Sequence, residues 1–288
     1  MKANIPQIAI LLAAYNGENW VVDQIKSILN QINVSIDIFV SIDFSTDNTF
    51  QLIKDLQYSN TNIEILKYGE RFGGAAKNFY RLIKEVDVSK YDFVALSDQD
   101  DIWLPDKLHK GINKLKLIGF DAYSSDVIAF WSDGRTKLIK KSYPQKKYDF
   151  MFESAGPGCT YILKTTVMVE FQKFLLDNWL QINQIDLHDW LIYAFCRSNN
   201  FNWLIDSNVG MLYRQHDNNQ FGANVSIRSY FTRLSLIKNG WYFGEVSKIS
   251  NLLKLTTPDN LFVFSNFMQL RRKKRDSLIL FLFYFLRN

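Results

Sequence analysis

Cysteine is scarce in this chain of 288 residues, which contains only Cys159 and Cys196. Two cysteines cannot form a disulfide framework for a chain of this length, and neither lies in a Cys-x-x-Cys or Cys/His spacing typical of zinc sites. We therefore expect a reducing compartment. No stretch reaches the roughly 18 apolar residues that a bilayer span requires, and the first apolar run, residues 8–14, is too short for a signal peptide. These absences predict a soluble, cytoplasmic protein.

Most of the chain also has no excess of positive or negative charge. The formal net charge is +5, from 34 Lys and Arg against 29 Asp and Glu. Six of the basic residues and one acidic residue lie within residues 271–288, so residues 1–270 are balanced. Because a nucleic-acid-binding protein carries its positive charge along one face of the fold, no nucleic-acid partner is expected. The hydrophobic fraction of 47% is enough for a sizeable core and excludes a disordered or fibrous chain.

Strand and helix patterns alternate through the first hundred residues. Residues 8–14 form a continuous apolar run, as in a central parallel strand buried on both faces. Further strands are predicted at residues 36–42, 63–68, 93–96, 127–131 and 208–214. Helices are predicted at residues 21–32, 46–56, 75–85, 164–176 and 188–198, after Pro105, and over much of the chain from residue 226. This order predicts an α/β fold with a mostly parallel sheet flanked by helices and a mainly helical C-terminal extension.

Three carboxylates lie within four residues where one predicted strand ends, at Asp98, Asp100 and Asp101. Ligands of parallel sheets bind beyond the carboxyl ends of the strands, and Asp43 ends a second strand. Side chains alternate in an extended segment, so we expect Asp98 and Asp100 on one side and Asp101 on the other. Two carboxylates on one face favour a hard cation such as Mg²⁺ or Mn²⁺. The alternative is a solvated turn that only starts the next helix.

Several short motifs in a fixed order resemble one known family. Residues 14–17 read Ala-Tyr-Asn-Gly, residues 41–47 Ser-Ile-Asp-Phe-Ser-Thr-Asp, residues 73–79 Gly-Gly-Ala-Ala-Lys-Asn-Phe, and residues 97–108 Ser-Asp-Gln-Asp-Asp-Ile-Trp-Leu-Pro-Asp-Lys-Leu. Residues 155–160 then read Ala-Gly-Pro-Gly-Cys-Thr, residues 187–190 Leu-His-Asp-Trp, and residues 213–219 Tyr-Arg-Gln-His-Asp-Asn-Asn. This order, over about residues 5–222, resembles family 2 glycosyltransferases of the GT-A fold. It is most similar to the rhamnosyltransferase-like group that builds bacterial cell-surface polysaccharides.

The resemblance implies a role for the acidic turn. Asp98 and Asp100 correspond to the DxD motif, in which Asp98 contacts the donor ribose or the metal shell and Asp100 ligates a divalent cation, Mn²⁺ or Mg²⁺. A cation there neutralises the charge that develops on the nucleoside diphosphate. Asp101 is the alternative ligand. His216 is a further candidate metal ligand or diphosphate contact, although a lone histidine is as often a packed or surface residue.

The resemblance also implies a catalytic base, Asp189, which takes the proton from the attacking acceptor hydroxyl. His188 is a candidate helper, but adjacent positions on a helix point about 100° apart, so the two side chains cannot aim at one atom. The alternative for Asp189 is a helix N-terminus, where Asp is favoured by the helix dipole. With an unperturbed pKa near 4, Asp189 would be ionised at neutral pH. The family implies a single displacement with inversion at the anomeric carbon.

Further candidate residues for binding the donor follow from the same motifs. They are Ala14, Tyr15, Asn16, Asp43, Lys77, Asn78, Asp98, Gln99, Arg214 and His216. Gly73 and Gly74 would let the backbone approach the donor. For Arg214 a phosphate contact and a salt bridge are equally good expectations.

The motif at the second strand departs from the family pattern. The family reads Asp-Asp-Gly-Ser, whereas Ile42 and Phe44 here replace the first carboxylate and the glycine. This departure leaves the nucleotide open and suggests an alternative, a catalytically impaired module that binds a nucleotide or glycan. A metal-dependent nucleotidyltransferase is less well supported, because the turn at residues 15–18 is not a glycine-rich loop with Lys or Arg.

The expected activity is an inverting, metal-dependent transfer of one sugar from a nucleotide diphosphate donor to a hydroxyl of a growing bacterial surface glycan. The donor is dTDP-rhamnose, or otherwise a UDP-hexose, and the glycan is an O-antigen, a capsule or a cell-wall polysaccharide. Residues 1–222 would form the GT-A domain, with a donor half at about 1–105 and an acceptor half at about 106–222. Residues 223–288 would form the helical extension.

The chain ends with a basic cluster and an apolar run. Residues 271–275 are five consecutive cations, and residues 278–286 are apolar and aromatic. This pair suits peripheral contact with an anionic membrane, as for an acceptor carried on a lipid. The alternative is a helix packed on the catalytic domain or a partner, with the basic run solvated.

Overall fold

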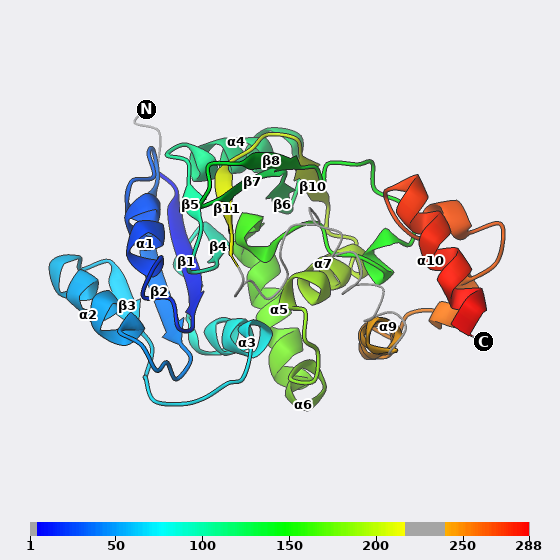
Figure 1. Cartoon of the computed structure of the whole chain (residues 1–288), viewed down its shortest axis with the longest axis horizontal. Helices are drawn as coiled ribbons and strands as arrows, with labels where there is room; N and C mark the ends of the chain where they lie inside the picture. Colours follow the sequence, from blue (N-terminus) through cyan, green and yellow to red (C-terminus); the bar gives the residue numbers. More distant parts are fainter. Residues whose placement is uncertain (1–4, 217–239, 288) are drawn as a thin grey trace.

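Two β-sheets organise the described part of this computed structural model, residues 5–216 and 240–287 (Figure 1). The larger sheet has the strand order β10 (Trp203–Asp206), β6 (Ala122–Ser125), β9 (Ile162–Lys164), β4 (Phe93–Ser97), β1 (Gln7–Ala14), β2 (Ser35–Ile42) and β3 (Ile63–Ile65). Its neighbours are parallel except β9, which runs antiparallel to β4 and β6. The smaller sheet has the order β5 (Ile102–Trp103), β11 (Met211–Gln215), β7 (Val127–Trp131) and β8 (Thr136–Ile139).

Strand β1 is buried on both faces, as its continuous apolar sequence predicts. Ile8, Ile10 and Leu12 face one hydrophobic cluster, which they share with α1 (Val21–Leu29), α2 (Thr49–Ser59) and α4 (Lys107–Ile118). Ala9 and Leu11 face a second cluster on the other side of the sheet. That cluster contains residues of α3 (Ala75–Glu85), α5 (Thr165–Asp177), α6 (Trp179–Ile182), α7 (His188–Ser198), α9 (Trp241–Leu252) and α10 (Lys274–Arg287). The predicted α/β architecture is confirmed.

Most predicted elements are present, with shifted ends. Strand β3 stops at Ile65 instead of residue 68, and α1 stops at Leu29, so Ile32 lies beyond the helix and is exposed. Helix α2 begins at Thr49, whose N–H donates to the Asp47 carboxylate at 3.0 Å. Strand β11 begins at Met211, three residues later than predicted. Asp217, Asn218 and Asn219, the predicted boundary at residues 222–223 and the helical prediction for residues 226–239 lie outside the described residues.

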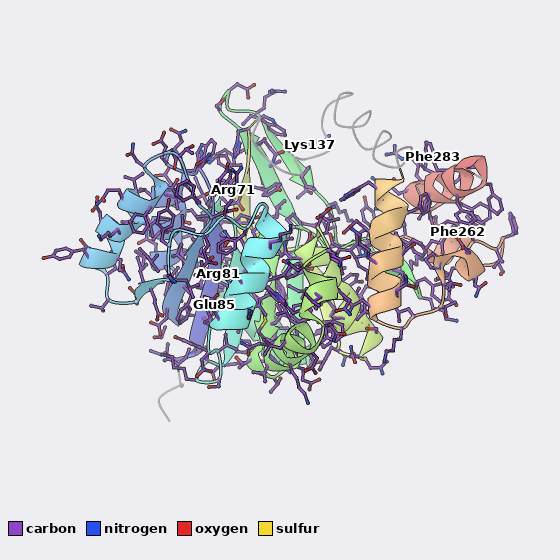
Figure 2. All side chains as sticks on the ribbon, turned by 90° about the horizontal axis from the view of Figure 1, so that it is seen from below. Arg71, Arg81, Glu85, Lys137, Phe262 and Phe283 are labelled. Atoms are coloured by element: carbon purple, nitrogen blue, oxygen red, sulfur yellow. The ribbon has the colours of Figure 1, made fainter. Side chains whose placement is uncertain are left out.

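Helix α3 is tied to the larger sheet by one buried arginine. Arg81 donates to Ser41 Oγ of β2 at 3.2 Å and to the Lys67 carbonyl at 2.7 Å, and its Nε pairs with Glu85 at 3.1 Å (Figure 2). Its guanidinium also lies over the ring of Phe72, 4.8 Å from the centroid. These contacts hold the segment that follows β3 against α3 and so position the glycines at the start of that helix.

The C-terminal extension packs on the α/β part, at the opposite side of the molecule from α2 and β3 (Figure 1). Phe262 stacks on Tyr284 of α10, with ring centroids 3.8 Å apart, and meets Phe152 edge-on at 5.5 Å; Figure 2 labels Phe262 and Phe283 in this region. The predicted alternative, a helix packed on the catalytic domain, agrees with this arrangement. Within residues 5–216 and 240–287, no helix combines the length and apolar composition that a bilayer span demands.

The prediction of a solvated basic run is wrong for its first two members. Arg272 is only 4% exposed and pairs with the buried Asp149 at 3.3 Å, while Arg271 pairs with Glu153 at 3.4 Å. The three cations that follow, at residues 273–275, are exposed. Two of the five cations therefore form ion pairs with carboxylates that are largely removed from water. Such carboxylates require a partner of opposite charge.

Candidate active site

A cleft of about 970 Å³ opens at the carboxyl ends of β1, β2 and β4. Strand β1 lies between β2 and β4, and the chain crosses from one side of β1 to the other after β3, so the cleft lies where the strand order reverses. The predicted site residues that line it are Ala14, Tyr15, Asn16, Asp43, Asn78, Asp98, Gln99, Asp100, Asp189 and His216. Lys77 and Arg214 are not among the lining residues.

The floor of the cleft at the end of β1 is fixed by a side-chain amide. Gln99 accepts from the Tyr15 N–H at 2.8 Å and donates to the Tyr15 carbonyl at 2.7 Å, so it pairs with that backbone in both directions. Gly17 lies against the same amide, and a Cβ there would come within 2.2 Å of the Gln99 oxygen. The side chain of Gln99 therefore joins the Ala-Tyr-Asn-Gly turn to the acidic turn.

Asp43 and Asn78 shape the loop beside that floor. The Asp43 carboxylate, which is 4% exposed, accepts from the N–H groups of Phe44 and Phe72 at 2.8 Å and of Gly73 at 3.0 Å. Asn78 donates to the carbonyls of Ala14 and Ser41 at 3.2 and 3.0 Å. Both residues line the cleft, and the hydrogen bonds of their side chains within the described part of the chain are all to the backbone, so they hold the segment at residues 72–73 and the end of β1 in place.

The acidic turn does not divide fully as side-chain alternation predicts, because ligand atoms of Asp98 and Asp101 lie within 4.8 Å of each other. Asp98 and Asp100 line the cleft, whereas Asp101 is fully buried beneath it and accepts from the Arg214 N–H at 3.0 Å. Arg214 also donates through Nε to the Asp100 carbonyl at 2.8 Å and lies 3.8 Å from Asp23. Arg214 therefore stabilises the acidic turn, and its contact with Asp23 agrees with the expectation that this arginine forms a salt bridge.

His216 lies directly against Asp100. Its Nε2 is 2.8 Å from Asp100 Oδ2, and its ring stacks on Trp20 with centroids 3.9 Å apart. Asp100 and His216 offer one carboxylate and one imidazole, and such oxygen and nitrogen ligands suit Mn²⁺ or Mg²⁺. Asp98 also lines the cleft, although one oxygen of its carboxylate lies within 4.8 Å of ligand atoms of Asp101 and Cys159. Asp100 and His216, with Asp98 beside them, are the residues that would hold such a cation.

Burial sets the electrostatics of the turn. Desolvation and the charge of Asp100 raise the pKa of Asp98 to about 7, and burial raises the pKa of Asp101 well above its usual range. Lys107 is buried behind the turn, donates to the Cys159 carbonyl at 2.8 Å, and has its pKa lowered to about 7 by burial. Asp98, Asp101 and Cys159 also place ligand atoms within 4.8 Å of one another. A cation among those three would lie near Lys107, so the Asp100–His216 side fits a metal better.

Asp189 lies in the first turn of α7 and accepts from the Trp190 N–H at 2.7 Å. Burial raises the pKa of Asp189 to about 6, against the lowering effects of that hydrogen bond, of Lys141 and of Ser154. The expected pKa near 4 is therefore too low. His188 stacks on Phe79 at 4.0 Å and its Nε2 faces Gly158, where burial lowers its pKa to about 3. His188 also lines the cleft, but its lowered pKa and its packing on Phe79 favour a neutral, structural imidazole.

The two departures from the family motif lie outside the cleft. Ile42 is 1% exposed and belongs to the hydrophobic cluster under α1. Phe44 is half-exposed and stacks parallel to Tyr68, with centroids 6.2 Å apart. Neither side chain lines the cleft, so the substitutions leave its described walls intact.

Sequence reasoning missed several residues that line the cleft: Trp20, Lys141, Trp241, Tyr242 and Arg271. It also missed the buried Lys107, although that residue closes the Asp-Ile-Trp-Leu-Pro-Asp-Lys segment of the acidic-turn motif. Trp20 lies only three residues beyond Gly17. A large aromatic residue next to a turn that ends a strand could have indicated a cleft-lining position. Trp241, Tyr242 and Arg271 have no local signal, because only tertiary packing brings them to the cleft.

Comparisons with known proteins agree with this geometry. The model of the family described as glycosyl transferase family 2 matches residues 9–171. The dTDP-rhamnosyl transferase RfbG of Shigella flexneri is 45% identical over 282 residues, which cover 94% of this chain and 98% of that protein. An Escherichia coli protein named UDP-Glc:alpha-D-GlcNAc-diphosphoundecaprenol beta-1,3-glucosyltransferase WfgD is 28% identical over 57% of this chain and 62% of its own length.

Solved structures share the fold. The S. aureus protein TarS, residues 1–349 in complex with UDP, aligns over 96% of this chain and 70% of its own with a TM-score of 0.58 and 15% identity. The mannosyltransferase PcManGT from Pyrobaculum calidifontis, in complex with GDP-Man and Mn²⁺, aligns over 96% of this chain and 74% of its own with a TM-score of 0.58 and 13% identity.

The first prediction concerns the cation. Asp100→Asn should abolish the Mn²⁺-dependent part of nucleoside diphosphate binding, because it removes the carboxylate that faces His216 and the cleft. Thermal shift with nucleotide, with and without Mn²⁺, measures this. Asp106→Asn is the matched control, since Asp106 pairs with Lys110 on the surface of α4. Unchanged Mn²⁺ dependence in Asp100→Asn would remove Asp100 as a ligand.

The second prediction concerns Asp189. A general base must be ionised, so at saturating metal and donor the turnover should fall about tenfold per pH unit below pH about 6, the raised pKa of Asp189. Asp189→Asn should keep nucleotide affinity and lower turnover by roughly 10²- to 10⁴-fold. The exposed Asp177→Asn at the end of α5 is the control. A profile that stays flat well below pH 6 would argue against Asp189 as the base.

Proposed function

The chain belongs to glycosyl transferase family 2, and we propose that it transfers rhamnose from dTDP-rhamnose to a hydroxyl of a bacterial surface glycan. The observation that carries this proposal is a single cleft with a candidate cation site at Asp98, Asp100 and His216 and a candidate base, Asp189. The two parts are close enough for the charge of Asp189 to raise the pKa of Asp98. The name of the Shigella relative, dTDP-rhamnosyl transferase, supports the choice of donor.

The acceptor hydroxyl is activated by Asp189. With a pKa of about 6, this carboxylate is ionised at neutral pH and is a stronger base than an exposed aspartate. It takes the proton as the hydroxyl oxygen attacks the anomeric carbon of the donor. Attack from the side opposite the leaving diphosphate, in one displacement, inverts the configuration at that carbon.

The leaving diphosphate is placed at the ends of β1 and β4. When bound, a divalent cation on Asp98, Asp100 and His216 would neutralise the charge that develops on the diphosphate. The Gln99–Tyr15 pair and the Asp43 loop fix the surrounding backbone, so little reorganisation is needed on binding. Lys107 partly balances the buried carboxylates from the far side of the turn.

A UDP-hexose is the second candidate donor. It is supported by the UDP named in the TarS complex and by the name of the Escherichia coli relative. The alternative of a catalytically impaired module that binds a nucleotide or glycan rested mainly on Ile42 and Phe44. Neither residue lines the cleft, so this alternative is less well supported. No glycine-rich basic loop follows β1 among the described residues 15–18, so a nucleotidyltransferase has no phosphate cradle there.

The third prediction identifies the donor. dTDP with Mn²⁺ should stabilise the protein more than UDP, GDP or CMP with Mn²⁺, and each nucleotide should do less without the metal. Incubation with dTDP-rhamnose and a glycoside acceptor should then give a rhamnosylated product by mass spectrometry. Preference for UDP together with transfer of a hexose would select the second candidate. Nucleotide binding without turnover of any donor would contradict a transferase and restore the binding module.

We also propose that α10 rests on an anionic membrane that carries the acceptor lipid. What supports this is an exposed apolar face formed by Leu278, Leu282 and Phe285, which follow one another at helical spacing. The exposed cations at residues 273–275 immediately precede this face. Each basic residue near an anionic lipid surface contributes about 1 kcal/mol, so three of them give reversible, peripheral binding.

The fourth prediction tests that contact. Lys273→Glu with Lys274→Glu and Arg275→Glu should release the protein from phosphatidylglycerol vesicles in a flotation assay. The same number of changes at the exposed Arg135, Lys137 and Lys140 is the matched control. Point substitutions are preferable to deletion of residues 271–288, because Arg272 and Leu280 are buried. If the unaltered protein does not float with these vesicles, the membrane contact is excluded.

A further inference from the structure

The C-terminal extension supplies one wall of the cleft, on the side where Asp189 lies. Trp241 and Tyr242, at the start of α9, and Arg271, just before α10, line the cleft together with Trp190 and Asp189 of α7. These three residues lie far along the chain from every motif of the donor half. The wall they form belongs to the acceptor half of the proposed reaction.

Aromatic contacts fix the position of α9 in that wall. Tyr242 stacks on Trp190, with centroids 5.6 Å apart and planes 25° apart, and its hydroxyl donates to the Phe152 carbonyl at 2.6 Å. Trp241 donates through Nε1 to Asp186, one of the residues that lead into α7, at 3.1 Å. Both rings are therefore anchored at one edge while they line the cleft.

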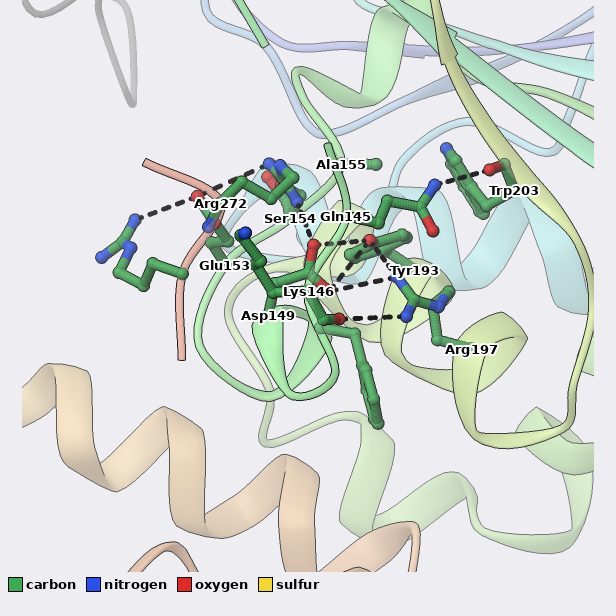
Figure 3. Close-up of polar contacts among 12 residues, drawn as sticks. Gln145, Lys146, Asp149, Glu153, Ser154, Ala155, Tyr193, Arg197, Trp203 and Arg272 are labelled. Carbon is green, nitrogen blue, oxygen red and sulfur yellow. Dashed lines mark hydrogen bonds and ion pairs between the residues drawn. The ribbon is translucent and has the colours of Figure 1, made fainter. Parts of the chain in front are cut away.

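A network of charges around Asp149, Glu153 and Arg272 lies beside this wall (Figure 3) and ends at Arg271. Asp149 accepts from Arg197, Arg272 and the Tyr193 hydroxyl, at 3.1–3.3 Å. Arg272 also donates through its backbone N–H to Glu153 and through its guanidinium to the Ser154 carbonyl. Glu153 then pairs with Arg271 at 3.4 Å, so the last charged pair of the network reaches the cleft.

We infer that Trp241, Tyr242 and the Glu153–Arg271 pair form a subsite for an uncharged pyranose ring of the acceptor. Aromatic faces pack against the apolar C–H face of a sugar, and convergent polar groups in a mostly apolar pocket set its orientation. Glu153 offers acceptors and Arg271 offers donors to the sugar hydroxyls. Because each charge of this pair already compensates the other, the pair does not select for an anionic sugar. This inference rests on the proposed function.

Trp241→Ala tests the aromatic part of the subsite. It should raise the KM for the acceptors p-nitrophenyl α-L-rhamnoside and p-nitrophenyl N-acetyl-glucosaminide by about tenfold and leave the Mn²⁺-dependent nucleotide thermal shift unchanged. Trp131→Ala, on β7 and not among the cleft-lining residues, is the matched control and should keep the KM for each acceptor. An unchanged acceptor KM in Trp241→Ala, or an equal rise in Trp131→Ala, overturns the subsite.

Arg271→Gln tests the polar part, with the exposed Arg275→Gln as its control. The acceptor KM should rise only in Arg271→Gln, and the neutral glycosides should be better acceptors than p-nitrophenyl glucuronide. Preference for the glucuronide overturns the assignment to an uncharged ring.

Saturation-transfer NMR separates this inference from the proposed function. In the presence of nucleotide and Mn²⁺, the neutral glycosides should bind the unaltered protein and lose their signal in Trp241→Ala, whether or not sugar is transferred. Binding without transfer would contradict the proposed donor and support the subsite. Transfer that persists while Trp241→Ala binds the glycosides normally would support the proposed function and overturn the subsite.

Discussion

The crowding of three carboxylates at the end of β4 is the constraint on which the rest of the site depends. Charges removed from water must be paired or neutralised, and each of the three carboxylates has a different environment that does this. Asp101 is buried and accepts from the backbone N–H of Arg214, Asp100 faces His216, and the pKa of Asp98 is raised to about 7 by burial and by the charge of Asp100. The smaller sheet makes this possible. Strand β5 follows the acidic turn directly and pairs with β11, which delivers Arg214 and His216 to the turn.

The wall of the cleft beside Asp189 meets the same constraint through residues of the C-terminal extension. Asp149 is fully buried and Glu153 is partly buried beside the loop that carries Ser154, and their partners include Arg271 and Arg272. Removing one partner of such a buried pair typically costs about 3–5 kcal/mol, which is a large part of the stability of an ordinary domain. The C-terminal extension is therefore held to the α/β part by charge as well as by apolar packing.

That the strand-end residues share one cleft could be predicted from the sequence, because each lies in a local motif. Tyr15, Asp43 and Asp98 each end a parallel strand, and neighbouring parallel strands bring their carboxyl ends to one edge. The acceptor half could not be predicted in the same way, since no local pattern indicates that Arg272 pairs with a carboxylate more than a hundred residues away. The raised pKa of Asp189 was missed for a related reason, because its cause is burial, which depends on tertiary packing.

The two halves of the cleft are consequently held by different forces. Hydrogen bonds between the backbone and the side chains of Asp43, Asn78 and Gln99 fix the strand-end part of the cleft, and they join the strand-end turns to α3 and the segment before it. Long-range ion pairs and aromatic contacts fix the acceptor half, and these depend on α9 and the segment before α10. A substitution in the extension can therefore change the acceptor wall without disturbing the donor loop.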